Sequence, residues 1–378
     1  MTLIEKSRRR LFGLFAGLGA LALVGACDMP AGLGVGNTKA VDANATVKVA
    51  LMVPLNSGQG ELEFLGSSLV NSARLARNDL AGVTIDLEVY PTGGDAATAA
   101  AAASRAVSDG AQIIVGPLFS TAATSVAPIA AQAGIPVLSF SNNADIAGNN
   151  VYLLGMTFDT IARRVVSYGA GQGRTNIAVV HSNDVAGIAG RAAAERAIQQ
   201  AGASFAGGFG YELSPAGISQ AAPEIAAQVK AAGANAIVFT DDPASGLVFL
   251  TPVLASSGLK AGPVQYLGLT RWNVPQEAAT TPSMQGGVFA VPDPNLQAQF
   301  EARYVATYGA APHSLAGLAY DGIAAIGAMV NEAKAAGTPA LSPAQITAPA
   351  GFVGVNGSFR LRADGSSGRG LALMQLRD

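Results

Sequence analysis

The sequence contains one cysteine, two histidines and one tryptophan in 378 residues, and 13% of its residues are charged. A single cysteine excludes an intrachain disulfide and a cysteine-based metal site. Two histidines leave little for a histidine metal centre or a Ser-His-Asp triad. No basic run follows the first ten positions and the formal net charge is −2, so nothing predicts a nucleic-acid partner. A dinucleotide fingerprint and a P-loop lysine are also missing. We therefore expect no enzyme, cofactor or metal site.

The cysteine, Cys27, follows a pattern typical of an exported protein. Basic residues up to Arg10 precede an apolar segment, 11–26, that is shorter than the ~20 residues of a membrane-spanning helix. This pattern predicts a signal peptide over 1–26. Val24-Gly25-Ala26-Cys27 resembles the bacterial lipobox, which implies a lipid on Cys27, attachment to a membrane and a periplasmic location.

Residues near the cysteine bear on the export pathway and on the choice between the inner and the outer membrane. Asp28 resembles the signal that retains some lipoproteins in the inner membrane, but the choice of membrane stays open. Ser7-Arg8-Arg9 resembles a twin-arginine motif, and ordinary Sec export fits equally. From Cys27 to Thr46 the chain is rich in Gly, Pro, Asn and Ala without a period, which predicts a flexible tether over 27–46.

The rest of the chain is globular in composition, with 50% hydrophobic residues, and is long enough for two domains. Apolar strand patterns alternate with helical ones. Strands are predicted at 47–55, 83–90, 111–116 and 135–140, and then at 176–181, 234–240, 265–269 and 286–291. Helices are predicted at 65–75, 120–133, 188–200, 295–308 and 314–336. Asp95 is a predicted N-cap for a helix up to Val107, and Asp242-Pro243 predicts the start of another. A hairpin that turns near Asp364-Gly365 follows. Strands rich in Val and Ile that alternate with helices predict an α/β fold with two doubly wound parallel sheets.

Small hydroxyl and amide residues follow three strands of the first series. Ligands of open α/β sheets bind beyond the carboxyl ends of the strands, and a helix N-terminus there favours an anion such as a carboxylate. Each of these residues could instead cap a helix or form a turn, but their recurrence at three strand ends indicates a binding site. The candidates are Ser57, Ser120, Thr121, Ser141, Asn142 and Asn143.

Five stretches carry a resemblance to a known family: VALMVPLNSGQGE, GAQIIVGPLFSTAATSVAPIAAQAGIPVLSFSNN, VVHSNDVAG, AIVFTDDPASG and GLAYDGIAAIG. They resemble type I periplasmic binding proteins of the leucine/isoleucine/valine-binding class. The resemblance implies two Rossmann-like lobes, joined by three crossovers, that close on a solute by hinge bending. It places 47–156 and 293–336 in lobe 1, and 157–292 and 337–378 in lobe 2.

The same resemblance implies roles for single residues. Ser120 matches a serine that holds a ligand carboxylate, and Ser141 and Asn143 match residues that assist it. The second lobe would add Asp184, Asp241 and Thr270. Trp272 is a further candidate for the cleft or a partner surface, although a large aromatic residue more often packs against its own domain. Members that bind amino acids often have a tyrosine where this chain has Ala186, and an acid for the ligand ammonium where it reads Leu269-Thr270-Arg271-Trp272.

QYLGLTRWNVP, APHSLAGLAYDGIAAIGA and GFVGVNGSFRLRADG further resemble lipoproteins labelled penicillin-binding protein activators. The first hypothesis is therefore a non-enzymatic lipoprotein that contacts a peptidoglycan synthase in cell-wall synthesis. The alternative is the solute receptor of an ABC importer, partnered by its permease, for a branched-chain-amino-acid-like or other small polar solute.

Overall fold

The computed structural model describes residues 39–377. Signal peptide, lipobox and most of the expected tether lie outside these residues. The tether prediction is wrong from Lys39 onwards, because Val41 and Ala43 are buried and Val41 forms a β-bridge to Ala340. Two apolar side chains among polar neighbours were enough to attach this segment to the first lobe.

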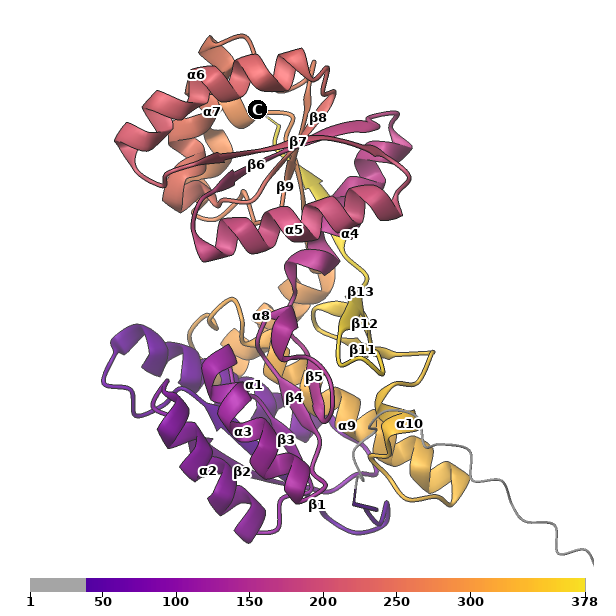
Figure 1. The fold of residues 1–378 in the computed structure, drawn as a ribbon. Helices are drawn as coiled ribbons and strands as arrows, with labels where there is room; N and C mark the ends of the chain where they lie inside the picture. The colour runs from indigo at the N-terminus through magenta and orange to yellow at the C-terminus, as the bar shows by residue number, and fades with distance from the viewer. Residues whose placement is uncertain (1–38, 378) are drawn as a thin grey trace, which may run out of the picture. The chain divides into compact units, whose positions relative to one another are not determined.

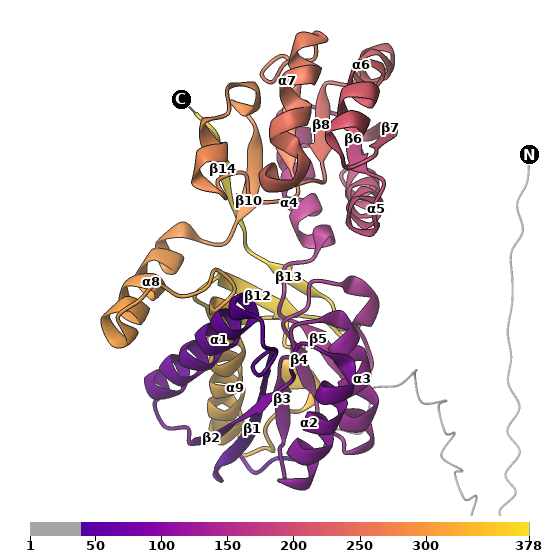
Figure 2. The same ribbon diagram turned by 90° about the vertical axis from the view of Figure 1, so that its left-hand side faces the viewer.

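The first lobe is built on a parallel sheet with the strand order β2-β1-β3-β4-β5. Its strands are β1 (Val47–Val53), β2 (Ile85–Pro91), β3 (Ile113–Val115), β4 (Val137–Ser139) and β5 (Val151–Leu153). Its main helices are α1 (Gly60–Asp79), α2 (Ala96–Ser108), α3 (Ser120–Gln132) and α9 (Gly317–Ala336). Alternate residues of β1 pack on opposite faces: Leu51 joins the core beneath α1 and α9, and Met52 the core beneath α2 and α3. Figure 2 shows the strands between these helix pairs, which confirms a doubly wound lobe.

The second lobe has a six-stranded sheet with the order β14-β10-β9-β8-β6-β7, in which only β14 is antiparallel. Its strands are β6 (Asn176–Ser182), β7 (Ser204–Tyr211), β8 (Ala236–Phe239), β9 (Gln265–Gly268), β10 (Val288–Val291) and β14 (Ala372–Gln375). Helices α4 (Phe158–Gly171) and α5 (Val185–Gln200) cover one face, and α6 (Pro215–Ala231) and α7 (Val248–Ser256) the other (Figure 1). The predicted fold class is confirmed.

A small antiparallel sheet, β11 (Phe352–Gly354), β12 (Gly357–Leu361) and β13 (Ser367–Arg369), contains the predicted hairpin, with Phe359 paired to Arg369. The expected boundary at 337 is wrong for this region. Leu341, Ile346 and Phe359 belong to the core of the first lobe. The helix α10 (Pro343–Ile346) precedes the small sheet, and α8 (Pro294–Tyr308) contacts α1. Only β14 continues into the second lobe. Period-2 alternation shows that a strand has one buried face, but not which core that face covers.

The described chain passes from one lobe to the other three times: after β5, after β10 and after β13. This agrees with the three crossovers that the family resemblance implied. One buried ion pair lies beside the last passage. Arg369 Nη1 donates to Asp321 Oδ2 at 2.9 Å, and both side chains have no solvent exposure. No helix within 39–377 combines the length and apolar character that crossing a bilayer demands.

Candidate ligand-binding site

The carboxyl ends of β1, β3 and β4 carry the predicted residues of the first lobe. These strands are neighbours in the sheet, so the segments that begin at Ser57, Ser120 and Ser141 follow adjacent strands at one edge. Thr121 and Asn142 are exposed there, and Asn143 is half-buried. The structure thus brings the six first-lobe candidates to one edge of one sheet.

The loop between β3 and α3 leads directly to this edge. Gly116 has φ +94° and packs against β1 so closely that a Cβ would clash with the carbonyl oxygen of Met52. α3 then begins at Ser120, and its N-cap residue, Phe119, has no side chain that can accept a hydrogen bond. The first backbone N–H groups of α3 therefore have no side-chain cap, in contrast to those of α2, which Asp95 caps. An uncapped helix N-terminus that also carries a hydroxyl can bind a carboxylate.

The loop after β4 is held by hydroxyl groups. Ser139 Oγ donates to the carbonyl of Pro117 at 2.9 Å, and this bond ties the loop to the segment before α3. Ser141 is buried, and its Oγ accepts the Asn143 N–H at 3.1 Å; its own proton has no acceptor among residues 39–377. The Asn143 side-chain oxygen accepts from Asp145 N and caps the short 3₁₀ helix η1 (Ala144–Ile146). Ser141 can thus donate to a ligand, while Asn143 mainly shapes the loop.

Ser57 has a partner that sequence reasoning missed. The Glu63 carboxylate accepts the Ser57 N–H at 2.7 Å, the Ser57 hydroxyl at 3.1 Å and the Gly58 N–H at 3.3 Å. Glu63 lies in the first turn of α1, where an acid also interacts favourably with the helix dipole. The only indication of this contact in the sequence is that Glu63 follows Ser57 by six residues. Because Ser57 already donates to Glu63, it organises the loop more than it offers a proton.

Two second-lobe candidates, Asp241 after β8 and Thr270 after β9, meet in a network with the last residues of β6 and β7. Asp241 accepts hydrogen bonds from the Tyr211 hydroxyl and, at 2.8 Å, from Ser182 Oγ. Thr270 Oγ1 donates to the Asp241 carbonyl at 2.9 Å. Burial raises the pKa of Asp241, although both hydroxyls act in the opposite direction. Burial, with Asp241 beside it, also raises the pKa of Tyr211. Tyr211 and Ser182 were not predicted.

The two acids that flank this network begin helices. Asp184 Oδ1 accepts from Gly187 N at 2.7 Å and caps α5, while its Oδ2 makes no hydrogen bond to residues 39–377. Asp242 accepts from Ser245 N at 2.9 Å and caps the π-helix η2 (Pro243–Leu247), as its Asp-Pro pattern predicted. Asp184 and Glu212, which follows β7, are exposed acids of this edge. Within 39–377, no three His, Cys, Asp or Glu side chains form a metal site.

Apolar side chains stand beside Asp184. Val185 and Ile188 are 87% and 55% exposed on the first turn of α5. They are three residues apart, so they lie on one side of the helix. The edge of the second lobe therefore offers both a carboxylate oxygen and an apolar surface.

Trp272 is a correction to the predicted site. Its side chain has no solvent exposure and lies in the second-lobe core between Phe239 and Phe289. The missing side chains of Gly268 and Gly287 make room for the indole, because a Cβ at either position would clash with it. A large aromatic ring stabilises a core more by full burial than at a wet surface. Trp272 therefore packs the lobe and does not line a ligand site.

Two α/β lobes joined by three passages, with polar residues after the carboxyl ends of their strands, define a bilobal ligand-binding protein. The model of the periplasmic binding protein family matches residues 46–378. The chain belongs to this family, in the leucine-binding class of type I, as the sequence resemblance indicated. Membership implies a periplasmic location and a binding role.

Solved structures support the fold. One is an ABC transporter substrate-binding protein from Desulfitobacterium hafniense in complex with Leu (18% identity, TM-score 0.64, 88% of this chain and 98% of that chain). Another is a branched-chain amino acid ABC transporter periplasmic ligand-binding protein from Burkholderia xenovorans (18%, 0.67, 87% and 90%). A third is a solute-binding protein of an ABC transporter from Rhodopseudomonas palustris in complex with 3,4-dihydroxybenzoic acid (18%, 0.58, 87% and 93%). No curated protein matches.

Proposed function

We propose that this chain is the solute receptor of an ABC importer and that it binds a small carboxylate at the carboxyl edge of the first-lobe sheet. The observation that carries this proposal is the start of α3. The first backbone N–H groups of α3 have no side-chain cap, and Ser120 lies in the first turn of this helix. Ser141, which has a proton to donate, follows β4, and β4 is the neighbour of the strand that leads to α3. Backbone and hydroxyl donors around one point suit an anionic oxygen pair.

The chemistry of the second lobe narrows the solute class. Asp241 is buried and bonded to two hydroxyls of its own lobe, and Asp242 caps η2. On this edge a ligand ammonium would meet the exposed carboxylates of Asp184 and Glu212, where an ion pair contributes about 0 to 1 kcal/mol. The apolar Val185 and Ile188 lie beside Asp184. We infer that the solute is a carboxylate with an apolar body and that an amino group adds little to its affinity. Leucine and 3,4-dihydroxybenzoic acid, the ligands named for two of the similar structures, both carry a carboxylate.

The importer role stands ahead of the cell-wall role that the sequence first suggested. The similar structures named above are transporter proteins, and this supports the alternative hypothesis better than the first one. A penicillin-binding protein activator remains a hypothesis carried by the sequence resemblance alone. We also propose that Cys27, outside the described residues, carries the lipid that attaches the receptor to a membrane.

A thermal-shift screen with paired compounds tests the carboxylate. The pairs are 4-methylpentanoate with 4-methylpentan-1-ol, and 3,4-dihydroxybenzoate with catechol; each differs at the carboxylate. Leucine, compared with 4-methylpentanoate, tests the amino group. A ligand at 100 times its dissociation constant stabilises the folded state by about 2.7 kcal/mol, which is visible as a rise in the melting temperature. We expect a rise with a carboxylate but not with its neutral partner. Equal shifts within both pairs, or none in a cooperatively melting protein, would contradict the proposal.

A serine pair then locates the site. Ser120→Ala removes a hydroxyl at the start of α3 and should weaken carboxylate binding by about 1 to 3 kcal/mol, the usual loss when a charged group loses one hydrogen bond. Ser104→Ala is the matched control, because its exposed hydroxyl bonds only to the Ala100 carbonyl within α2. Titration calorimetry should show a loss for the first variant alone. Equal affinities would remove Ser120 from the site.

A further inference from the structure

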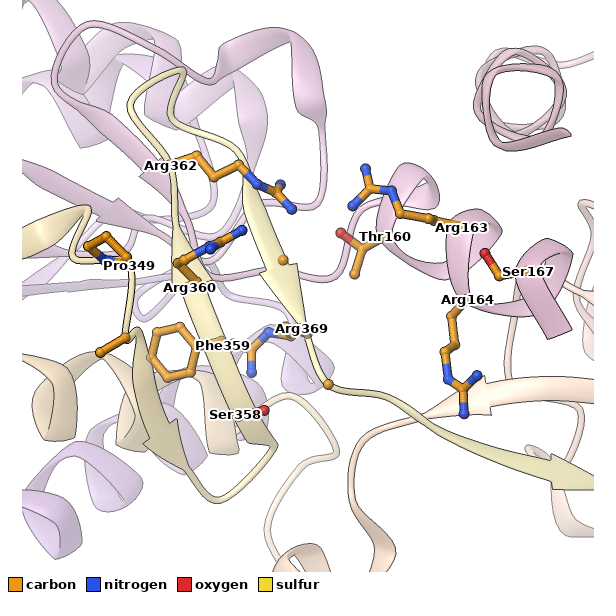
Figure 3. A pocket seen from close by; sticks show the side chains of 13 residues that line it. Thr160, Arg163, Arg164, Ser167, Pro349, Ser358, Phe359, Arg360, Arg362 and Arg369 are labelled. Atoms are coloured by element: carbon orange, nitrogen blue, oxygen red, sulfur yellow. The ribbon is translucent and has the colours of Figure 1, made fainter. Parts of the chain in front are cut away.

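A cavity of about 430 Å³, lined by none of the ligand-site candidates, lies between α4 and the β12–β13 hairpin. α4 contributes Thr160, Arg163, Arg164 and Ser167. The hairpin contributes Ser358, Phe359, Arg360, Arg362 and Arg369 (Figure 3). Thr160 Oγ1 donates to the Ser367 carbonyl of β13 at 3.2 Å, and Arg164 Nε donates to the carbonyl of Leu371, in the segment after β13, at 2.8 Å.

The lining of the cavity is strongly positive. Five arginines line it and no aspartate or glutamate does, although the whole sequence has 23 Lys and Arg against 25 Asp and Glu. The charge of Arg369 is balanced, because this residue forms the buried ion pair with Asp321. The other four arginines form no salt bridge to a described residue. An anion from outside the chain would complement this concentration of positive charge.

Three of these four side chains point towards one another. In Figure 3, Arg360 and Arg362 extend from β12 and the turn after it towards Arg163 on α4, whereas Arg164 points away. The bonds of Arg362 go to neutral oxygens, since its Nη1 donates to Ser366 Oγ at 3.1 Å and to the Ser367 carbonyl at 2.9 Å. These bonds orient the guanidinium group without neutralising it.

Electrostatics within the cluster agree with this geometry. Burial lowers the pKa of Arg362, and the guanidinium groups of Arg163 and Arg360 lower it further, while Asp364 in the hairpin turn acts in the opposite direction. The charged cluster is therefore unfavourable by itself, and a multivalent anion in the cavity would relieve the repulsion.

We propose that this cavity is a binding site for a phosphate-bearing anion, separate from the solute site. Guanidinium groups match phosphate oxygens in bidentate geometry. Arg163, Arg360 and Arg362 approach from two elements, so they can bind one multivalent phosphate from both sides. The hydroxyls of Thr160 and Ser358 line the same cavity and supply further donors. A soluble oligophosphate and the headgroup of an anionic phospholipid share this chemistry.

The soluble source is tested by calorimetric titration of the purified protein with tripolyphosphate at about 0.15 M salt, where exposed charges beyond ~8 Å are screened. We expect saturable binding that Arg360→Gln/Arg362→Gln weakens at least tenfold. Arg163→Gln, which leaves the hairpin unchanged, should weaken it at least threefold. The control is Arg74→Gln/Arg105→Gln, which removes the same charge from exposed positions in α1 and α2. Citrate tests selectivity for phosphate.

The lipid source is tested by co-flotation with phosphatidylcholine vesicles that contain or lack phosphatidylglycerol. The protein used is Cys27→Ser, so that an anchor does not mask the effect. The site is supported if tripolyphosphate or the anionic vesicles bind, if the cavity variants lose this binding, and if the control variant keeps it. Comparing the titration with the flotation then identifies whether the anion is soluble or a lipid headgroup. Absence of both, equal losses in the control, or a preference for citrate would overturn the proposal.

Discussion

Asp321→Asn should destabilise the protein strongly through one buried contact. Asp321 and Arg369 have no solvent exposure, and their atoms Oδ2 and Nη1 are 2.9 Å apart. Asparagine keeps the shape of the side chain but removes its charge, and this leaves the guanidinium of Arg369 buried without a counter-ion. Breaking a buried pair by removing one partner costs about 3 to 5 kcal/mol.

The surroundings of Arg369 place the expected loss near the lower end of that range. Its Nη2 donates to the Leu154 carbonyl at 2.8 Å, and its guanidinium carbon lies 4.7 Å from the centre of the Phe359 ring. Both contacts remain in the variant and stabilise the cation. We expect a loss of about 3 kcal/mol in the free energy of unfolding. For a protein domain of about 150–250 residues, each kcal/mol lost lowers the melting temperature by about 2 to 4 °C. The melting temperature should therefore fall by about 6 to 12 °C.

The matched control is Asp159→Asn. Asp159 Oδ1 and Arg196 Nε are 2.8 Å apart, so this ion pair is as close as the buried one. The side chains of Asp159 and Arg196 are, however, 29% and 53% exposed. An exposed pair contributes about 0 to 1 kcal/mol. Urea unfolding of both variants, with the slope checked against the wild type, measures the difference. Equal losses for the two variants would refute the argument that burial makes Asp321 essential.

Three further changes probe other parts of the chain. Cys27→Ser should release the protein from membranes on fractionation, and continued attachment would disprove the lipid anchor. Burial raises the pKa of the Asp241 carboxyl in the folded protein. The stabilisation that comes from its protonated form is therefore complete below the pKa of the unfolded chain, and it is lost as the pH rises through the pKa of the folded protein. The stability of the wild type relative to Asp241→Asn should therefore increase as the pH falls from 7 to 4, and a flat difference in urea unfolding would contradict this. Gly287→Ala places a Cβ against Trp272 and should cost about 1 to 3 kcal/mol. Its control, Gly171→Ala, has no neighbour within 4 Å and should be nearly neutral in the same assay.

Local patterns predicted much of the fold because their causes are local. Asp95 caps α2 and Asp242 caps η2, as their sequence contexts indicated. β7 was missed, because SFAGGFGY contains three glycines and glycine has low β-propensity. α6 was missed too: it contains Pro223, which weakens a helical prediction although the helix forms. In both cases packing within the second lobe overcame an unfavourable local preference.

The sequence by itself determined that the lobes are doubly wound and that serines and amides follow β1, β3 and β4. A strand buried on both faces must be apolar along its length, and a parallel sheet brings its carboxyl ends to one edge. Only the tertiary structure decided which polar groups find partners. It paired Ser57 with Glu63, bonded Asp241 to Tyr211, and buried Trp272. It also brought arginines of α4 and the β12–β13 hairpin, nearly 200 positions apart in the numbering, into one cavity. Contacts between distant segments depend on how whole lobes pack, and no local pattern records them.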